Sequence, residues 1–172
     1  PTAKPAFPFA KTTPGEMPVN DARFVILIGN AGPTMFNRFS RERRTSDTLL
    51  DDWTRSTVDP LAETLSAHAL YPFDRPPVPF LSWARRGGAG HVSPLGLNIH
   101  PTYGLWHAYR AALLFPVAFD LPPVSPGPHP CESCETKPCL TSCPVSAFDG
   151  KNYDVNQCAM YLATKTGGDC MT

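Results

Sequence analysis

Six cysteines are the residues of this chain best suited to chemistry, and all of them lie after residue 130. The first four, followed directly by a proline, have the spacing C-x2-C-x4-C-x3-C-P and are Cys131, Cys134, Cys139 and Cys143. Bacterial ferredoxins typically use C-x2-C-x2-C-x3-C-P, so two extra residues precede the third cysteine here. Because iron is held by soft, deprotonated sulfur, the spacing predicts that these cysteines bind an iron–sulfur cluster.

Zinc is the main competing metal for the same residues. A C-x2-C pair followed by a C-x3-C pair can form a four-cysteine structural zinc site. Zinc-binding pairs usually lie on two separated loops, and a proline after the last cysteine is not expected there, so the pattern favours iron and sulfide. Disulfides rank below both metals, because a disulfide framework would cross-link a whole small domain rather than its last quarter.

The remaining cysteines, Cys158 and Cys170, suggest a second cluster. The fourth cysteine of a ferredoxin motif commonly ligates the other cluster of a pair, so we expect the thiolates to divide three and three. The first cluster would take Cys131, Cys134 and Cys139, and the second would take Cys143, Cys158 and Cys170. Since each [4Fe–4S] cluster needs four thiolates, we expect each site to lack one ligand and the cysteine segment to be incomplete.

A second concentration of chemically useful side chains lies between residues 100 and 109. Aromatic or imidazole rings occupy five of these positions, His100, Tyr103, Trp106, His107 and Tyr109. Such rings offer a large contact area at low entropic cost, so they form our candidate binding set for a flat cofactor. Core packing between two strands is the competing interpretation. For His100 and His107, a hydrogen-bonding role is also commoner than a role as metal ligand.

Hydrophobic periodicity predicts the elements that must position these residues. Apolar runs predict strands at 23–28, 69–73, 95–100 and 110–115. Apolar stripes predict helices at 45–68 and 78–86. We expect Ser46 or Asp47 to cap the longer helix and Pro60 to kink or divide it.

Two glycine-rich segments raise the question of a ligand-binding loop. Residues 29–32 follow the first strand, but their spacing matches neither the dinucleotide fingerprint nor a P-loop, so they predict a tight turn. Residues 87–90 follow Arg85 and Arg86 and predict a helix end. A mobile loop over an anionic ligand is the alternative for this second segment.

Proline placement predicts the domain organisation. The 21 prolines crowd three segments, 1–20, 72–79 and 116–130, which should stay extended. We therefore expect four parts. They are a flexible tail at 1–20, an α+β body at 21–120, a proline-rich linker at 121–130 and an iron–sulfur segment at 131–172.

Composition excludes several classes of function. The chain has 15 basic and 15 acidic residues without long runs of one sign, which argues against a general nucleic-acid or membrane-surface binder. No apolar stretch approaches the roughly 20 residues that a membrane span needs. The first residues lack the apolar core of a secretory signal. We expect a cytoplasmic protein with no membrane association and no clear nucleic-acid site.

The order of the motifs resembles two known families. The cysteine motif, followed by the segments 156–162 and 168–170, resembles the double-cluster tail of epoxyqueuosine reductases, which are iron–sulfur relatives of reductive dehalogenases. The segments 80–86 and 93–110 resemble vitamin B12-processing proteins of the cobalamin C type. Together these resemblances imply a flavin-reductase-like α+β body followed by a ferredoxin-like tail.

The resemblance also implies a function. Two [4Fe–4S] clusters would pass single electrons to a cofactor or substrate on the body, with cobalamin as the first candidate cofactor and FMN as the second. The partners would be a small molecule and a redox protein, and the activity that of a corrinoid-linked reductase. The catalytic aspartate of epoxyqueuosine reductases has no assigned counterpart here. The alternative is a non-enzymatic ferredoxin-like electron carrier.

Overall fold

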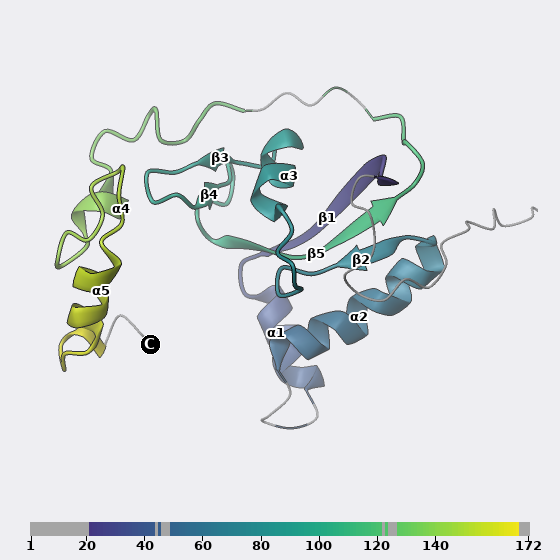
Figure 1. The fold of residues 1–172 in the computed structure, drawn as a ribbon, viewed down its shortest axis with the longest axis horizontal. Coiled ribbons are helices and arrows are strands. Elements are labelled where there is room, and N and C mark those ends of the chain that lie inside the picture. The colour runs from purple at the N-terminus through teal and green to yellow at the C-terminus, as the bar shows by residue number, and fades with distance from the viewer. Residues whose placement is uncertain (1–20, 44, 46–48, 122, 124–126, 169–172) are drawn as a thin grey trace, which may run out of the picture. The chain divides into compact units, whose positions relative to one another are not determined.

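The computed structural model describes residues 21–43, 45, 49–121, 123 and 127–168. The protein is a mixed α+β structure, and the described residues form five helices and two small antiparallel sheets (Figure 1). The chain divides into two compact units, which we call the sheet unit (1–88 and 106–125) and the cysteine unit (89–105 and 126–172). Residues 89–105, assigned to the body from sequence, thus pack with the cysteine segment, and the predicted domain ranges stay a prediction.

A three-stranded antiparallel sheet organises the sheet unit. Its order is β1 (Phe24–Ala31), β5 (His107–Phe115) and β2 (His68–Leu70). The predicted strand at 23–28 is confirmed, but β1 continues beyond it through a bulge between Ile28 and Gly29. A Cβ atom on Gly29 would lie 3.0 Å from the carbonyl oxygen of Ala108, so glycine lets the strand approach β5. The turn predicted at the start of 29–32 is therefore wrong.

Strand β5 is the centre of the core, because alternate residues are buried on opposite faces. Ala112 and Leu114 pack in one cluster with Phe80 and Trp83 of α3 (Phe80–Arg86). The intervening residues of β5 join a second cluster on the face of α2 (Leu50–Leu65). The residues of this second cluster are Val58, Ala62, Tyr71, Ala111, Leu113 and Phe115. The helices predicted at 45–68 and 78–86 are thus confirmed in their central parts.

The ends and interior of α2 differ from expectation. Ser46 and Asp47 lie outside the described residues, and the helix begins after Leu49, which makes no capping bond through its side chain. Pro60 does not divide the helix, since α2 continues to Leu65. Tertiary packing outweighs the missing hydrogen bond, because Val58 and Ala62 are buried on either side of the proline.

Helix α1 (Thr34–Glu42) was not predicted from sequence. Phe39 is its one buried residue within the described part of the chain, so the segment lacks a broad apolar stripe. Arg38 pairs with Glu42 along the helix, and the indole of Trp53 donates to the same carboxylate. The exposed contact with Trp53 attaches α1 to α2.

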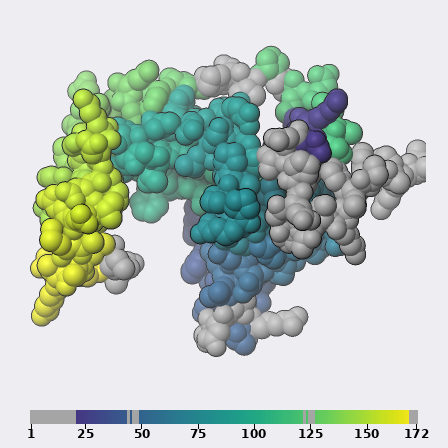
Figure 2. Space-filling view, viewed as in Figure 1, coloured from purple at the N-terminus to yellow at the C-terminus, as the bar shows by residue number. Residues whose placement is uncertain are grey.

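The cysteine unit contains short elements joined by turns. Strands β3 (His91–Val92) and β4 (Asn98–Ile99) form a hairpin, so the strand predicted at 95–100 is reduced to two residues. Two helices follow, α4 (Pro138–Thr141) and α5 (Val155–Leu162). The Asp154 side chain caps α5 by accepting the Gln157 N–H at 2.9 Å. No residue of α5 is buried, and the yellow part of the chain that contains it is visible in the space-filling view (Figure 2).

The helices of the described residues are short or polar. None of them is long and apolar enough to cross a membrane.

Candidate metal centre

Five of the six cysteines lie in the described part of the cysteine unit. Cys131, Cys134, Cys139, Cys143 and Cys158 are half-buried and none of them is joined in a disulfide. Cys170 lies outside the described residues. The side chains fall into two groups that differ in their surroundings.

The first group consists of Cys131, Cys134 and Cys139. Burial raises the pKa of the Cys131 thiol, and the neighbouring charges of Cys139 and Cys134 raise it further. Lys137 opposes this effect with its positive charge. Cys131 thus lies within electrostatic range of both Cys134 and Cys139. These are the same three cysteines that the sequence assigns to a first cluster.

The second group consists of Cys143 and Cys158, which share Tyr153 as a neighbour. Backbone N–H groups lower the pKa of Cys143, foremost that of Ala147, which donates to Sγ at 3.3 Å. The Tyr153 side chain hydrogen-bonds to Cys158, and this bond raises the pKa of the phenol. The charge of Cys143 acts on the same phenol. The predicted ligand set of Cys143, Cys158 and Cys170 stays a prediction.

The thiols do not surround a common point at which a metal ion could be bound. Among the described residues, no three His, Cys, Asp or Glu side chains form a set that could hold a metal ion. The donors fit a thiolate-bound metal by chemical type, because all five are free thiols. Cys170, the sixth donor in the predicted set, lies outside the described residues.

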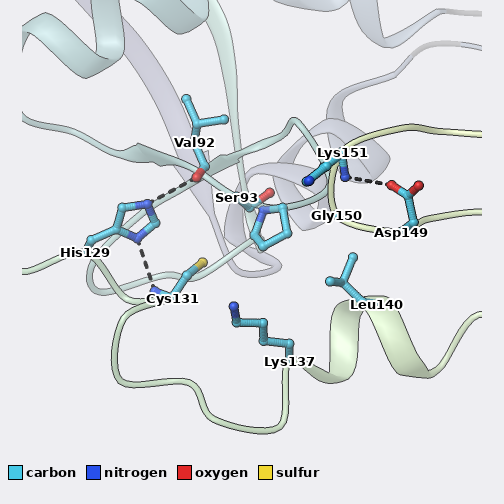
Figure 3. Close-up of a pocket in the computed structure, with 10 residues that line it drawn as sticks. Val92, Ser93, His129, Cys131, Lys137, Leu140, Asp149, Gly150 and Lys151 are labelled. Atoms are coloured by element: carbon cyan, nitrogen blue, oxygen red, sulfur yellow. Dashed lines mark hydrogen bonds between the residues drawn. The ribbon is translucent and has the colours of Figure 1, made fainter.

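His129 attaches the first group to the β3–β4 hairpin (Figure 3). Its Nδ1 accepts the backbone N–H of Cys131 at 3.1 Å, and its Nε2 lies 3.1 Å from the carbonyl oxygen of Val92. An acceptor role for Nδ1 places the proton of the neutral ring on Nε2, which then donates to Val92. The ring also stacks on His91, with centroids 4.6 Å apart.

A cavity of about 450 Å³ lies beside Cys131 within the cysteine unit. Ser93, Lys137 and Lys151 are among its lining residues, and the Lys137 side chain extends toward it (Figure 3). Sequence analysis identified neither lysine, nor His129, nor Tyr153. The sequence offered one clue to these four residues, since each lies near a cysteine in the chain. Their contacts with the cysteines and the cavity depend on the fold.

The five candidate cofactor-binding residues are divided between the two units. His100 and Tyr103 belong to the cysteine unit, where Nδ1 of His100 accepts the N–H groups of Thr102 and Tyr103 at 3.0 and 3.3 Å. Trp106, which is 86% exposed, His107 and Tyr109 belong to the sheet unit. The rings of His107 and Tyr109 meet edge to face. A single pocket built from all five residues stays a prediction.

Tyr109 lines a cavity of its own in the sheet unit. This cavity has a volume of about 480 Å³, and Pro79, Phe80, Leu81 and Arg85 contribute to its wall. The predicted helix end at 87–90 is confirmed, since α3 ends at Arg86 and Gly87 caps it. The cavity is a place where a flat group could contact Tyr109 within one unit.

A polar network on the opposite side of the same sheet joins α2 to the loop after β2. The Tyr71 hydroxyl donates to Asp59 at 2.5 Å, and Arg55 pairs with Asp74 at 2.8 Å. Arg55 also lies over the Tyr71 ring, 4.4 Å from its centroid. Burial raises the pKa of Tyr71 well above its usual range, and the bond to Asp59 adds to the effect. The network ties α2 to this loop, because Arg55 and Asp74 form an ion pair and Asp59 accepts the Tyr71 hydroxyl.

Comparison with known proteins adds no family to this description. No family model, curated protein or solved structure matches the chain. The resemblances to epoxyqueuosine reductases and to cobalamin C-type proteins therefore stay predictions.

Proposed function

We propose that this chain is an iron–sulfur protein that transfers single electrons. The observation that carries the proposal is the grouping of the five described thiols. Cys131 interacts with Cys134 and Cys139, whereas Cys143 and Cys158 meet around Tyr153. The described thiols are free and half-buried, so they are available as thiolate ligands.

The surroundings of the second group support iron and sulfide over a purely structural metal. Hydrogen bonds to ligand sulfur tune the reduction potential of iron–sulfur clusters, and both thiols of this group receive them. The donor to Cys143 is a backbone N–H, and the donor to Cys158 is a phenol. Bound clusters would supply one-electron chemistry, with Cys131, Cys134 and Cys139 holding one and Cys143, Cys158 and Cys170 the other.

The finer proposal is a corrinoid-linked reductase with a flavin-reductase-like body and a ferredoxin-like tail. The mixed α+β architecture and the cavity beside Tyr109 support it. The electron acceptor would be a small molecule or a cofactor, cobalamin first and FMN second, and a redox protein would supply the electrons. Reduced thiols suit a cytoplasmic location. A ferredoxin-like carrier is the alternative without a bound acceptor.

Metal and cobalt analysis of anaerobically purified protein tests the proposal. We expect iron and acid-labile sulfide together with broad visible absorption that bleaches on addition of dithionite. Stoichiometric zinc without iron would contradict the iron–sulfur assignment. Cobalt in the same preparation would support the corrinoid-linked reductase, and its reproducible absence together with that of flavin would favour the carrier.

Titration with cobalamin separates the two forms of the proposal further. Added cobalamin should change its own visible spectrum and quench tryptophan emission in a saturable way. Trp106→Ala should weaken binding while changing the free energy of unfolding by less than about 0.5 kcal/mol, because the side chain is 86% exposed. Folded protein without a saturable change up to about 1 mM cobalamin or flavin would exclude the reductase form.

A further inference from the structure

The cavity beside Cys131 contains groups that iron–sulfur binding does not use. Lys137 precedes α4, and Lys151 lies in the turn that follows residue 149. Both residues line the cavity, and the Lys137 side chain extends toward it (Figure 3). An ammonium group has three hydrogen-bond donors and no acceptor. Two of them around one cavity favour an anion.

A buried hydroxyl lines the same cavity. Ser93 is 4% exposed, and its Oγ has no hydrogen-bond partner within the described residues. A buried hydroxyl left without a partner lowers stability, so such groups are usually satisfied. A bound acceptor atom would satisfy this one.

Asp149 is the acidic residue of the cavity wall, and its carboxylate is engaged in its own turn. Oδ1 accepts the backbone N–H groups of Lys151 and Asn152 at 2.7 and 2.6 Å, and Oδ2 accepts the Asn152 amide at 3.1 Å. These bonds lower the pKa of Asp149. The two lysines and Asp149 together leave the lining with one positive charge in excess. The carboxylate is hydrogen-bonded to its own turn and not to the ammonium group of either lysine.

We propose that this cavity binds the phosphate group of a small molecule, with Lys137 and Lys151 as counter-charges and the Ser93 hydroxyl as a neutral donor. Two ammonium groups from separate loops match a dianion, and lysine is a common phosphate ligand. The volume of about 450 Å³ leaves room for the rest of a small phosphorylated molecule. None of these three residues is a proposed iron ligand, although Cys131, which is one, lines the same cavity.

Calorimetric titration of the full chain with inorganic phosphate tests the proposal. Ionic strength is held constant with chloride, so that a general salt effect does not mimic binding. We expect saturable binding with a Kd below about 10 mM. Lys151→Gln should weaken it about tenfold or more, since a hydrogen bond to a charged group is lost, and Ser93→Ala should weaken it about two- to tenfold. Glycerol 3-phosphate should compete for the same site.

Lys165→Gln is the matched control, because this lysine is exposed in the same unit and does not line the cavity. The control should bind phosphate as the unsubstituted chain does. Near-ultraviolet circular dichroism checks the fold of each variant. Lys137→Gln is a further variant that should weaken binding, and Lys151→Gln decides the test if Lys137→Gln fails to fold. Absence of saturable binding up to about 50 mM phosphate would overturn the proposal. Equal weakening by Lys165→Gln, or failure of the ester to compete, would do the same.

Discussion

Nδ1 of His129 accepts the backbone N–H of Cys131 at 3.1 Å, so an imidazole of the linker fixes the first cysteine of the metal motif. The same ring reaches the carbonyl oxygen of Val92 through Nε2. The cysteine loop is thereby held to the β3–β4 hairpin through one side chain. Residues far apart in sequence are joined at the point where the proposed ligands begin.

Removing this imidazole should free the Cys131 amide. We expect His129→Leu to speed hydrogen exchange at Cys131 about two- to tenfold, the effect of losing one hydrogen bond of about 0.5–1.5 kcal/mol. His100→Leu is the control, because it removes the acceptor of the Thr102 and Tyr103 amides instead. Unchanged exchange at Cys131 in His129→Leu would show that the contact does not restrain the loop.

The two cysteine groups should react at different rates in metal-free protein. Backbone N–H groups lower the pKa of Cys143, whereas burial and the charges of Cys139 and Cys134 raise that of Cys131. Only the thiolate is alkylated, so iodoacetamide at about pH 7 should label Cys143 before Cys131. As the pH falls, labelling of Cys143 should continue at pH values at which labelling of Cys131 has stopped. Mass spectrometry of the labelled peptides measures both rates.

Unfolding provides the control for this comparison. In a high concentration of urea the two thiols lose their different surroundings, and their alkylation rates should converge. Faster labelling of Cys131 than of Cys143 in folded protein would contradict the described hydrogen bonding at Cys143.

Tyr71 should make stability dependent on alkaline pH. Burial, followed by the hydrogen bond to Asp59, raises its pKa above the unfolded value of about 10. The protonated phenol therefore contributes stability that is fully present below about pH 10 and is lost as pH rises through the folded pKa. Tyr71→Phe should lower the free energy of unfolding at pH 8 by about 1–2 kcal/mol, because Asp59 loses a donor.

Denaturant unfolding at several pH values checks this expectation. Tyr71→Phe should also show a shallower decline of stability above about pH 10 than the unsubstituted chain. The control is Tyr103→Phe, since Tyr103 is 52% exposed and belongs to the other unit. A decline of equal steepness in Tyr71→Phe would assign the alkaline sensitivity to another group.

Sequence reasoning succeeded where local periodicity decides structure. The strand at 110–115 was predicted from its continuous apolar run, and the helices at 45–68 and 78–86 from apolar stripes. Helix α1 was missed because Phe39 alone is buried on it. Gly29 was assigned to a turn, although its missing side chain serves a close approach of two strands.

In the candidate site, too, the sequence indicated what depends on local spacing and missed what depends on tertiary contacts. Cysteine spacing alone placed Cys131 with Cys134 and Cys139, and the described electrostatic contacts follow that grouping. The roles of His129 and Tyr153 depend on partners brought together by turns and stacking, such as the Tyr153 ring on Phe148. Spacing carries no information about such contacts.

Electron paramagnetic resonance of the dithionite-reduced, anaerobically reconstituted full chain tests the central claim most directly. The protein should give the signal of a reduced iron–sulfur cluster, with iron and acid-labile sulfide present in equal amounts. Cys134→Ser should diminish the signal, whereas Ser133→Ala, a change at the neighbouring position, should preserve it. A silent spectrum from folded protein that carries stoichiometric zinc and no iron would contradict the claim.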